Sequence, residues 1–189
     1  ARAGLALVFP DTSPRGHDVP DDEAYNLGKG AGFYVDATEA PWATHYRMWS
    51  YVTKDLTELL GEEFPIDLGR QAICGHSMGG HGALTIAAAH PGRFASVSAF
   101  APIAHPSTSD WGRKQLSAYL GSDEGAWVPH DSVIQMRERG IDAPVLVDQG
   151  THDQFIDTLK PEALAEAMAA RRQPGALRLQ AGYDHSYFF

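Results

Sequence analysis

The stretch Gly75-His76-Ser77-Met78-Gly79-Gly80-His81-Gly82 decides the fold. It follows a short apolar run, residues 71–74, and leads into an alanine-rich run, residues 83–89, that is typical of a helix. A strand, a Gly-x-Ser-x-Gly turn and a helix in this order form the tight turn that presents a nucleophilic serine. A glycine-rich turn that cradles a phosphate is the alternative, but the stretch has no lysine to hold one. We therefore predict Ser77 as a nucleophile.

Apolar and periodic segments alternate along the rest of the chain, which predicts a three-layer α/β fold with a mostly parallel sheet. We expect a single domain over residues 1–189. The glycine-rich stretch 16–40 lacks periodicity and is expected to be a loop rather than a cofactor site. Strands are expected at residues 5–9, 71–74, 95–100, 144–148 and 177–180, and helices at 42–60, 79–90, 111–120, 132–139 and 161–172.

The composition limits the class of protein. The chain has 189 residues, 43% of them hydrophobic, and a formal net charge of −9. No apolar run is long enough to span a bilayer, and the acidic balance argues against nucleic acid or a membrane surface as a partner. Cys74 is the single cysteine, so no intrachain disulfide can form, which fits the cytoplasm. We expect Cys74 to be buried and unreactive.

Three loops should gather at one edge of the sheet, because reactive groups collect at the carboxyl ends of parallel strands. The loop after residue 74 carries Ser77, the loop after 148 carries Asp153, and the loop after 180 carries His185. Histidine can take the proton of a serine hydroxyl, and a carboxylate on its other nitrogen fixes the tautomer. We predict Ser77, Asp153 and His185 as a catalytic triad, and prefer Asp153 over three other nearby carboxylates: Asp148, Asp157 and Asp184.

The other histidines offer no competing site. His76 and His81 flank the serine and are expected to pack or to form hydrogen bonds. No two histidines stand at i, i+4 beside a glutamate on a helix, so we expect no metal and no cofactor.

The sequence also resembles the S-formylglutathione hydrolase (esterase D) family, within the α/β hydrolases. The blocks that carry the resemblance are residues 75–84, 10–16, 30–38, 46–48, 98–103, 119–121, 148–150, 153–155 and 182–187. The resemblance implies a thioesterase that converts S-formylglutathione to formate and glutathione, with esterase activity on short acyl esters. It carries over the same triad, Ser77, Asp153 and His185, together with the backbone N–H of Met78 as one donor of the oxyanion hole.

The resemblance further implies a chain truncated at both ends, which lacks the N-terminal strands of the family's sheet. The missing third strand should lie between residues 5–9 and residues 71–74, so we expect a gap there, or a non-native closure of it. The second oxyanion donor would lie on the missing part. We also consider a homodimer as the assembly.

Three readings of the function stay open. One is a thioesterase acting on S-formylglutathione, and another is a general carboxylesterase or acyltransferase of the same fold. A third is an inactive fragment or binding module. Arg15, Lys29, Arg113 and Lys114 could bind a glutathione carboxylate or be ordinary solvated surface. Trp42 and Trp111 could line a pocket or pack in the core.

Overall fold

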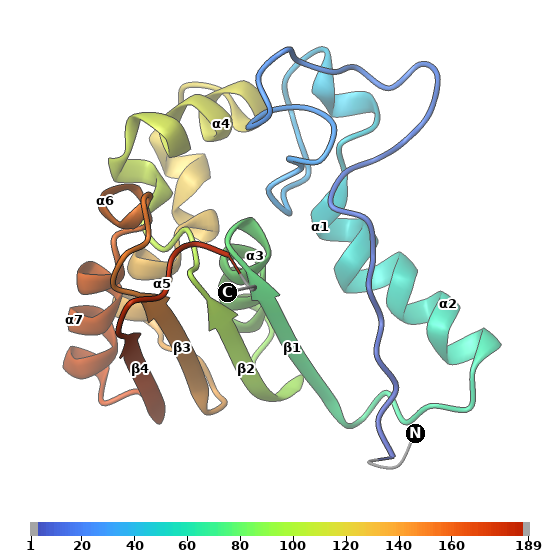
Figure 1. Ribbon diagram of the computed structural model, residues 1–189. Helices are drawn as coiled ribbons and strands as arrows, with labels where there is room; N and C mark the ends of the chain where they lie inside the picture. The colour runs from blue at the N-terminus through green and yellow to red at the C-terminus, as the bar shows by residue number, and fades with distance from the viewer. Residues whose placement is uncertain (1–3, 187–189) are drawn as a thin grey trace.

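The computed structural model describes residues 4–186. Four strands alternate with helices from residue 71 onwards, after a first third that, from residue 4, contains long loops and helices but no strand (Figure 1). The strands are β1 (Gln71–His76), β2 (Phe94–Phe100), β3 (Val145–Gly150) and β4 (Gly175–Gln180). The α-helices are α1 (Met48–Ser50), α2 (Leu56–Glu63), α3 (Met78–Ala89), α4 (Asp110–Leu120), α5 (Ser132–Glu138), α6 (Ile156–Leu159) and α7 (Pro161–Arg171). Short 3₁₀ helices are η1 (Trp42–Thr44), η3 (Pro106–Thr108) and η4 (Glu124–His130), and η2 (Tyr51–Asp55) is a π-helix.

The four strands form one parallel sheet in the order β1-β2-β3-β4. His76 lies opposite Phe100, and Phe100 lies opposite Asp148, so the carboxyl ends of these strands are level. The loops that follow all four strands therefore start from one edge of the sheet, as the α/β prediction requires.

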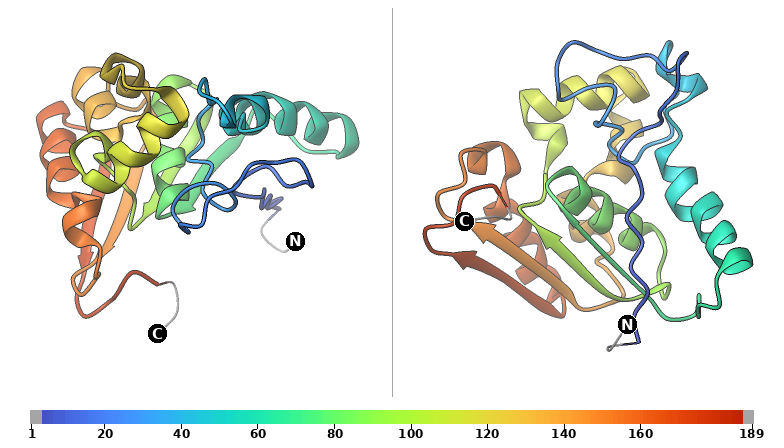
Figure 2. Two further views of the ribbon diagram at one scale, coloured as in Figure 1. Left: turned by 90° about the horizontal axis from the view of Figure 1, so that it is seen from above. Right: turned by 45° about the vertical axis from the view of Figure 1, so that its right-hand side comes forward.

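Helices α3, α5 and α7 cover one face of the sheet (Figures 1 and 2). The core between them is aliphatic, with Leu84 and Ile86 from α3 against Val97 and Val147 from the strands. Within residues 4–186, no helix covers the opposite face (Figure 2). Cys74 is exposed there, so the prediction that it is buried is wrong, because the prediction assumed that both faces of β1 are covered.

The predicted strand at residues 5–9 is absent. This segment runs between β1 and α2 without joining the sheet (Figures 1 and 2), and Leu5, Leu7 and Phe9 expose 71%, 75% and 86% of their surface. An apolar run becomes a buried strand only when a neighbour supplies its hydrogen bonds and covers its faces. β1 is therefore an edge strand of the sheet, and residues 5–9 do not pair with it in the part of the chain that the structure describes.

The predicted helix at 42–60 is broken into η1, α1, η2 and α2, and it continues to Glu63. Gly61 lies inside α2 rather than after its end. Its missing side chain makes room for Leu68, because a Cβ at Gly61 would lie 2.7 Å from Leu68 Cδ1. Pro65 stops the helix instead, since the residue before a proline is disfavoured in the α region.

The long loop before α1 is ordered by buried tyrosines. The Tyr119 hydroxyl accepts a hydrogen bond from Gly28 N at 2.9 Å and donates one to Ala31 O at 2.8 Å. The Tyr46 hydroxyl donates to Pro20 O at 2.7 Å. Tyr46, Tyr119 and Trp42 pack together in a second apolar cluster, so Trp42 belongs to the core. None of the helices within residues 4–186 has the length and apolar character needed to cross a membrane.

Candidate active site

Ser77 stands on the sharp turn between β1 and α3. Its φ of 54° and ψ of −115° lie in a region that non-glycine residues avoid, which is the strain expected of such a turn. Gly75 makes the turn possible, because a Cβ there would lie 2.3 Å from the backbone carbonyl carbon of Gly79. Hydrogen bonds hold the strained residue in place: Ser77 N donates to Phe100 O at 2.8 Å, and His81 N donates to Ser77 O at 3.0 Å.

His185 bridges the serine and the acid. Its Nε2 accepts a hydrogen bond from Ser77 Oγ at 2.9 Å, and its Nδ1 donates to Asp153 Oδ2 at 2.7 Å. The side chain of Asp153 is fully buried and that of His185 is 15% exposed. The structure thus brings together the three residues that the sequence singles out, from three loops at one edge of the sheet.

The Asp153 carboxylate is held by two further donors. Phe155 N donates to Oδ1 and Gln149 Nε2 donates to Oδ2, each at 2.8 Å. A buried carboxylate is costly unless its oxygens accept hydrogen bonds, and these two contacts supply them. Sequence reasoning missed Gln149, although it lies in the 148–150 block that carries the family resemblance.

The rejected carboxylates are used elsewhere. Asp148 pairs with Arg178 at 2.5 Å, and this ion pair lowers the pKa of Asp148. Asp184 accepts hydrogen bonds from the hydroxyl and the backbone N–H of Ser186. Asp157 is exposed on α6.

Met78 is the first residue of α3. The first N–H groups of a helix have no partner inside it and lie at the positive end of the helix dipole. The Met78 N–H is therefore suited to a developing negative charge next to Ser77.

The two histidines beside Ser77 have different surroundings. His76 Nε2 donates to the backbone oxygen of His185 at 2.6 Å, and the two rings are 4.7 Å apart. His81 is fully buried between α3 and the loop at Phe33, and burial lowers its pKa to about 4. Both histidines pack or form hydrogen bonds, as the sequence predicts.

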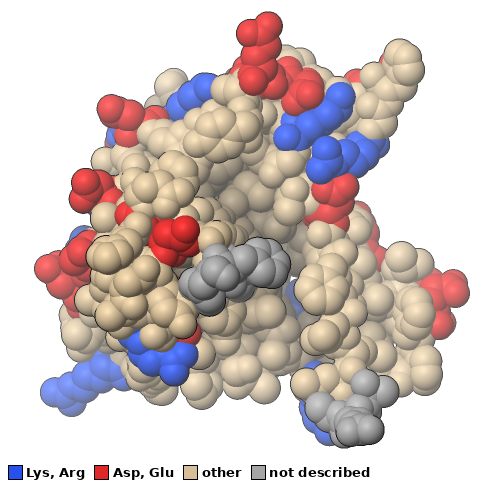
Figure 3. Space-filling model, in the orientation of Figure 1, with Lys and Arg blue, Asp and Glu red and all other residues tan. Residues whose placement is uncertain are grey.

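A hollow of about 290 Å³ lies beside His185, and its lining includes His76, Asp148 and Tyr183. Aromatic side chains flank the histidine on another side: the Phe155 ring meets His185 edge-on at 5.0 Å and stacks on Trp111 at 6.0 Å. Figure 3 shows that this face is hollowed, with the lysines and arginines visible in this view mainly near the outline of the molecule.

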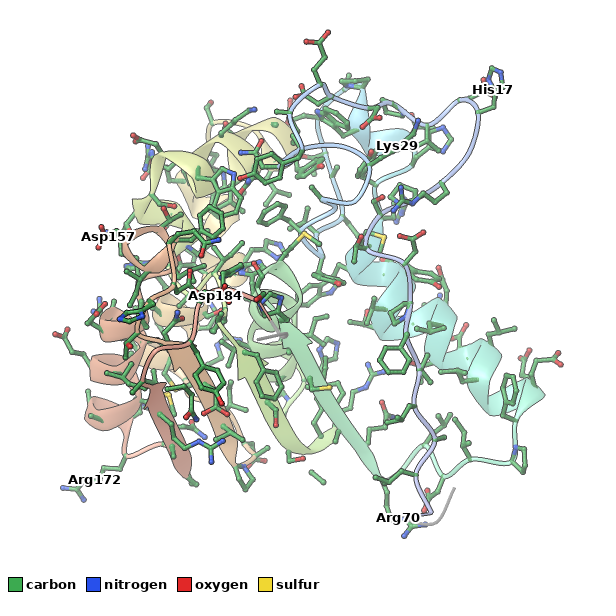
Figure 4. The ribbon with its side chains drawn as sticks, viewed as in Figure 1. His17, Lys29, Arg70, Asp157, Arg172 and Asp184 are labelled. Carbon is green, nitrogen blue, oxygen red and sulfur yellow. The ribbon has the colours of Figure 1, made fainter. Side chains whose placement is uncertain are left out.

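The basic residues considered for a glutathione carboxylate have acceptors of their own. Arg15 pairs with Asp11 at 2.9 Å, Lys29 lies 3.7 Å from Asp21, and Arg113 pairs with Glu124. Lys114 Nζ contacts Asn26 Oδ1. Lys29 also lies far from the Asp184 loop in Figure 4. These contacts favour the solvated-surface interpretation.

A parallel sheet with a serine on a strained strand-to-helix turn defines the α/β-hydrolase class. Residues 1–188 match the family model described as "Putative esterase". The chain is 68% identical over 189 residues to the S-formylglutathione hydrolase of Paracoccus denitrificans (strain Pd 1222), and covers 68% of that relative. The chain belongs to this esterase family, as the sequence resemblance indicates.

Solved structures of two other proteins are also similar to this chain. An S-formylglutathione hydrolase from Agrobacterium tumefaciens superposes with a TM-score of 0.91 at 50% identity, over 94% of this chain and 65% of that one. An S-formylglutathione hydrolase (FrmB) from Staphylococcus aureus, 18% identical with a TM-score of 0.62 over 82% of this chain and 62% of that one, shares the fold. The chain thus spans about two thirds of the length of these relatives. Tyr187, the last residue of the resembling blocks, lies outside the described residues.

Proposed function

We propose that this chain carries the catalytic centre of a serine thioesterase that hydrolyses S-formylglutathione to formate and glutathione. The observation that carries the proposal is the pair of hydrogen bonds through which His185 joins Ser77 to Asp153. The substrate follows from the printed name of the 68% identical relative. The chain spans about two thirds of the length of these relatives, so the substrate is part of the proposal.

Acylation begins when His185 Nε2 takes the proton of Ser77 and Oγ attacks the formyl carbon. The carbonyl oxygen becomes an oxyanion, to which the Met78 N–H donates a hydrogen bond. As the tetrahedral intermediate collapses, the carbon–sulfur bond breaks and His185 gives its proton to the departing glutathione sulfur. Asp153 stabilises the imidazolium formed in between.

Deacylation repeats these steps with water. His185 removes a proton from the water, the oxygen attacks the formyl carbon of the ester on Ser77, and a second oxyanion forms. Collapse returns the proton to Oγ and releases formate. The chemistry needs no metal or cofactor, because the side chains named here supply every proton transfer.

A general carboxylesterase is the second candidate. The Phe155 ring beside His185, with Trp111 stacked on it, favours this candidate, because the two rings offer an apolar surface to the acyl or leaving group of a simple ester. The ratio of kcat/KM on S-formylglutathione to that on an aryl acetate separates the two. A ratio well above one supports the thioesterase, and a ratio below one supports the carboxylesterase.

Two finer parts of the proposal concern location and assembly. A cytoplasmic location is supported by the single cysteine and by the presence of glutathione as the thiol of the substrate. The second part is a homodimer, which the proposed chemistry neither requires nor excludes. Sedimentation equilibrium of the purified protein tests the dimer, and a monomer over the micromolar range contradicts it.

Replacing the nucleophile tests the activity itself. Ser77→Ala should abolish turnover of S-formylglutathione and labelling by a fluorophosphonate, since no other group can form the acyl intermediate. Ser122→Ala, at an exposed serine, is the matched control and should keep both. If the unaltered protein neither labels nor turns over, it is a binding module or inactive fragment. If Ser77→Ala keeps turnover, the assignment of the nucleophile is wrong.

A further inference from the structure

The Tyr34 side chain lies along the first turns of α3. A Cβ on Gly82 would meet its ring at 2.4 Å, and a Cβ on Gly79 would lie 3.8 Å from its hydroxyl. The ring therefore runs from the second turn of the helix towards the N-terminus, and the hydroxyl ends beside Gly79, two residues after Ser77.

Tyr34 and His185 approach this helix end from different sides. The loop that contains Tyr34 reaches the start of α3 from the side of α1 and α2, whereas the loop that contains His185 comes from β4 (Figures 1 and 2). In the attack of a serine on a carbonyl, the leaving group is on the side of the histidine that protonates it, and the oxyanion is directed to the helix N-terminus. The Tyr34 hydroxyl is thus on the side of the oxyanion.

The backbone at this position is strained. Phe33 and Tyr34 have φ values of 50° and 52°, two consecutive aromatic residues in the left-handed region that favours glycine. Such strain is kept only where the surrounding structure imposes it, and it is concentrated at functional sites. Here it turns the Tyr34 ring onto α3.

The hydroxyl of Tyr34 is free to bind something else. Tyr46 and Tyr119, which order the same long loop, both use their hydroxyls in hydrogen bonds to its backbone. The Tyr34 hydroxyl has no hydrogen bond to any of residues 4–186. Burial raises the pKa of Tyr34, and Asp11 raises it further, so the phenol stays protonated and can donate at neutral pH.

We propose that Tyr34 is an oxyanion donor: its hydroxyl donates a hydrogen bond to the acyl oxygen of the tetrahedral intermediate, beside the Met78 N–H. The inference rests on the proposed function of Ser77. Packing against Gly82 accounts for the aromatic ring but not for a hydroxyl directed at the helix end, since a phenylalanine would pack equally well. No bond is made or broken at Tyr34, and its proton stays on the phenol throughout.

The test compares Tyr34→Phe with the unaltered protein and with Tyr25→Phe, whose tyrosine is 77% exposed. Tyr34→Phe should lower kcat on S-formylglutathione and the rate of fluorophosphonate labelling by about tenfold or more, with little change in KM. The affinity for a trifluoromethyl ketone, which forms a stable oxyanion on the serine, should weaken by the same factor. The melting temperature should stay the same, because the hydroxyl has no partner among the described residues.

The outcomes separate this inference from the proposed function. An unaltered protein that does not react with the fluorophosphonate overturns both. An unaltered protein that reacts, with Tyr34→Phe equal to it in kcat and labelling rate, overturns the role of Tyr34 alone. A rise in KM at constant kcat also overturns it, since the hydroxyl would then bind the substrate and the transition state equally.

Discussion

At the scale of single residues, a second histidine, His76, helps to position His185. His76 Nε2 donates to the backbone oxygen of His185 at 2.6 Å, in a loop that lies near the end of the chain. Burial lowers the pKa of His76, although its hydrogen bond to the backbone of His185 acts in the opposite direction, so at neutral pH His76 is an uncharged donor. His76 therefore acts on the reaction through His185 and is a positioning residue.

Removal of the His76 N–H donor should allow His185 to move away from its position between Ser77 and Asp153. His76→Leu is expected to lower kcat/KM by about tenfold or more, because a small displacement of a catalytic group is costly. His76→Gln keeps an N–H of similar reach and should recover most of the loss. Steady-state kinetics of both variants, with melting temperatures as a control, test this. Equal losses in the two variants would show that the ring matters for packing and not for its hydrogen bond.

Asp153 has a role that depends on its charge and not only on its shape. In Asp153→Asn, the amide can donate to His185 Nδ1, which places the imidazole proton on Nε2, where it can no longer accept from Ser77. We expect kcat to fall by about 10³–10⁴ with the fold intact. Asp157→Asn, at an exposed carboxylate, is the control and should change kcat little. A kcat near that of the unaltered protein would show that another acid serves His185.

At the scale of the element, the first turns of α3 contain a close approach that only glycine permits. Gly82 is in contact with the Tyr34 ring, whereas a Cβ on Gly79 would meet nothing closer than 3.8 Å. Gly82→Ala should thus lower the free energy of unfolding by about 1–3 kcal/mol through overpacking. Gly79→Ala, in the same helix, should leave it unchanged or raise it by about 0.5–1 kcal/mol, since alanine is the better helix former. Urea unfolding of the two variants checks the difference, and equal destabilisation would contradict it.

The local sequence pattern predicted the strands and helices that pack against other elements of this chain. The four strands of the sheet and the helix after Ser77 follow from apolar runs and glycine spacing, and they occur where expected. Residues 5–9 have the same kind of apolar pattern but no neighbouring strand, so they form none. Gly61 has the pattern of a residue just past a helix end, but it lies inside α2, where a Cβ would meet Leu68.

At the scale of the whole molecule, some residues of the site can be predicted from the sequence and others cannot. Ser77, Asp153 and His185 could be singled out because parallel strands bring their loops to one edge, and the chemistry requires those side chains. His76 and Tyr34 contact residues far away in sequence, which no local pattern encodes. Gln149 lies only four residues from Asp153, but its contact depends on how the loop after β3 folds back. The exposure of Cys74 was missed for a similar reason, because it depends on what covers the sheet.

The stability of the whole molecule should decrease towards acidic pH because of two buried histidines. Burial lowers the pKa of His81 and of His130 from 6.5 to about 4. No hydrogen bond from the described residues reaches either nitrogen of His81 or the Nδ1 of His130. Below pH 6.5 the unfolded chain binds a proton at each site, whereas the folded protein does not until about pH 4. The free energy of unfolding should thus fall steadily between these two values, by about 1.4 kcal/mol for each pKa unit at each histidine at most.

A variant that cannot titrate isolates this effect. The His130 ring meets Trp49 edge-on at 5.3 Å, so His130→Phe keeps an aromatic ring in that contact and removes the ionisation. Urea unfolding at several pH values from 7 to 4.5 should give a slope of stability against pH about half that of the unaltered protein. His17→Gln removes a fully exposed histidine and should keep the original slope. If His130→Phe also keeps it, carboxylates and not buried histidines set the acid sensitivity of this fold.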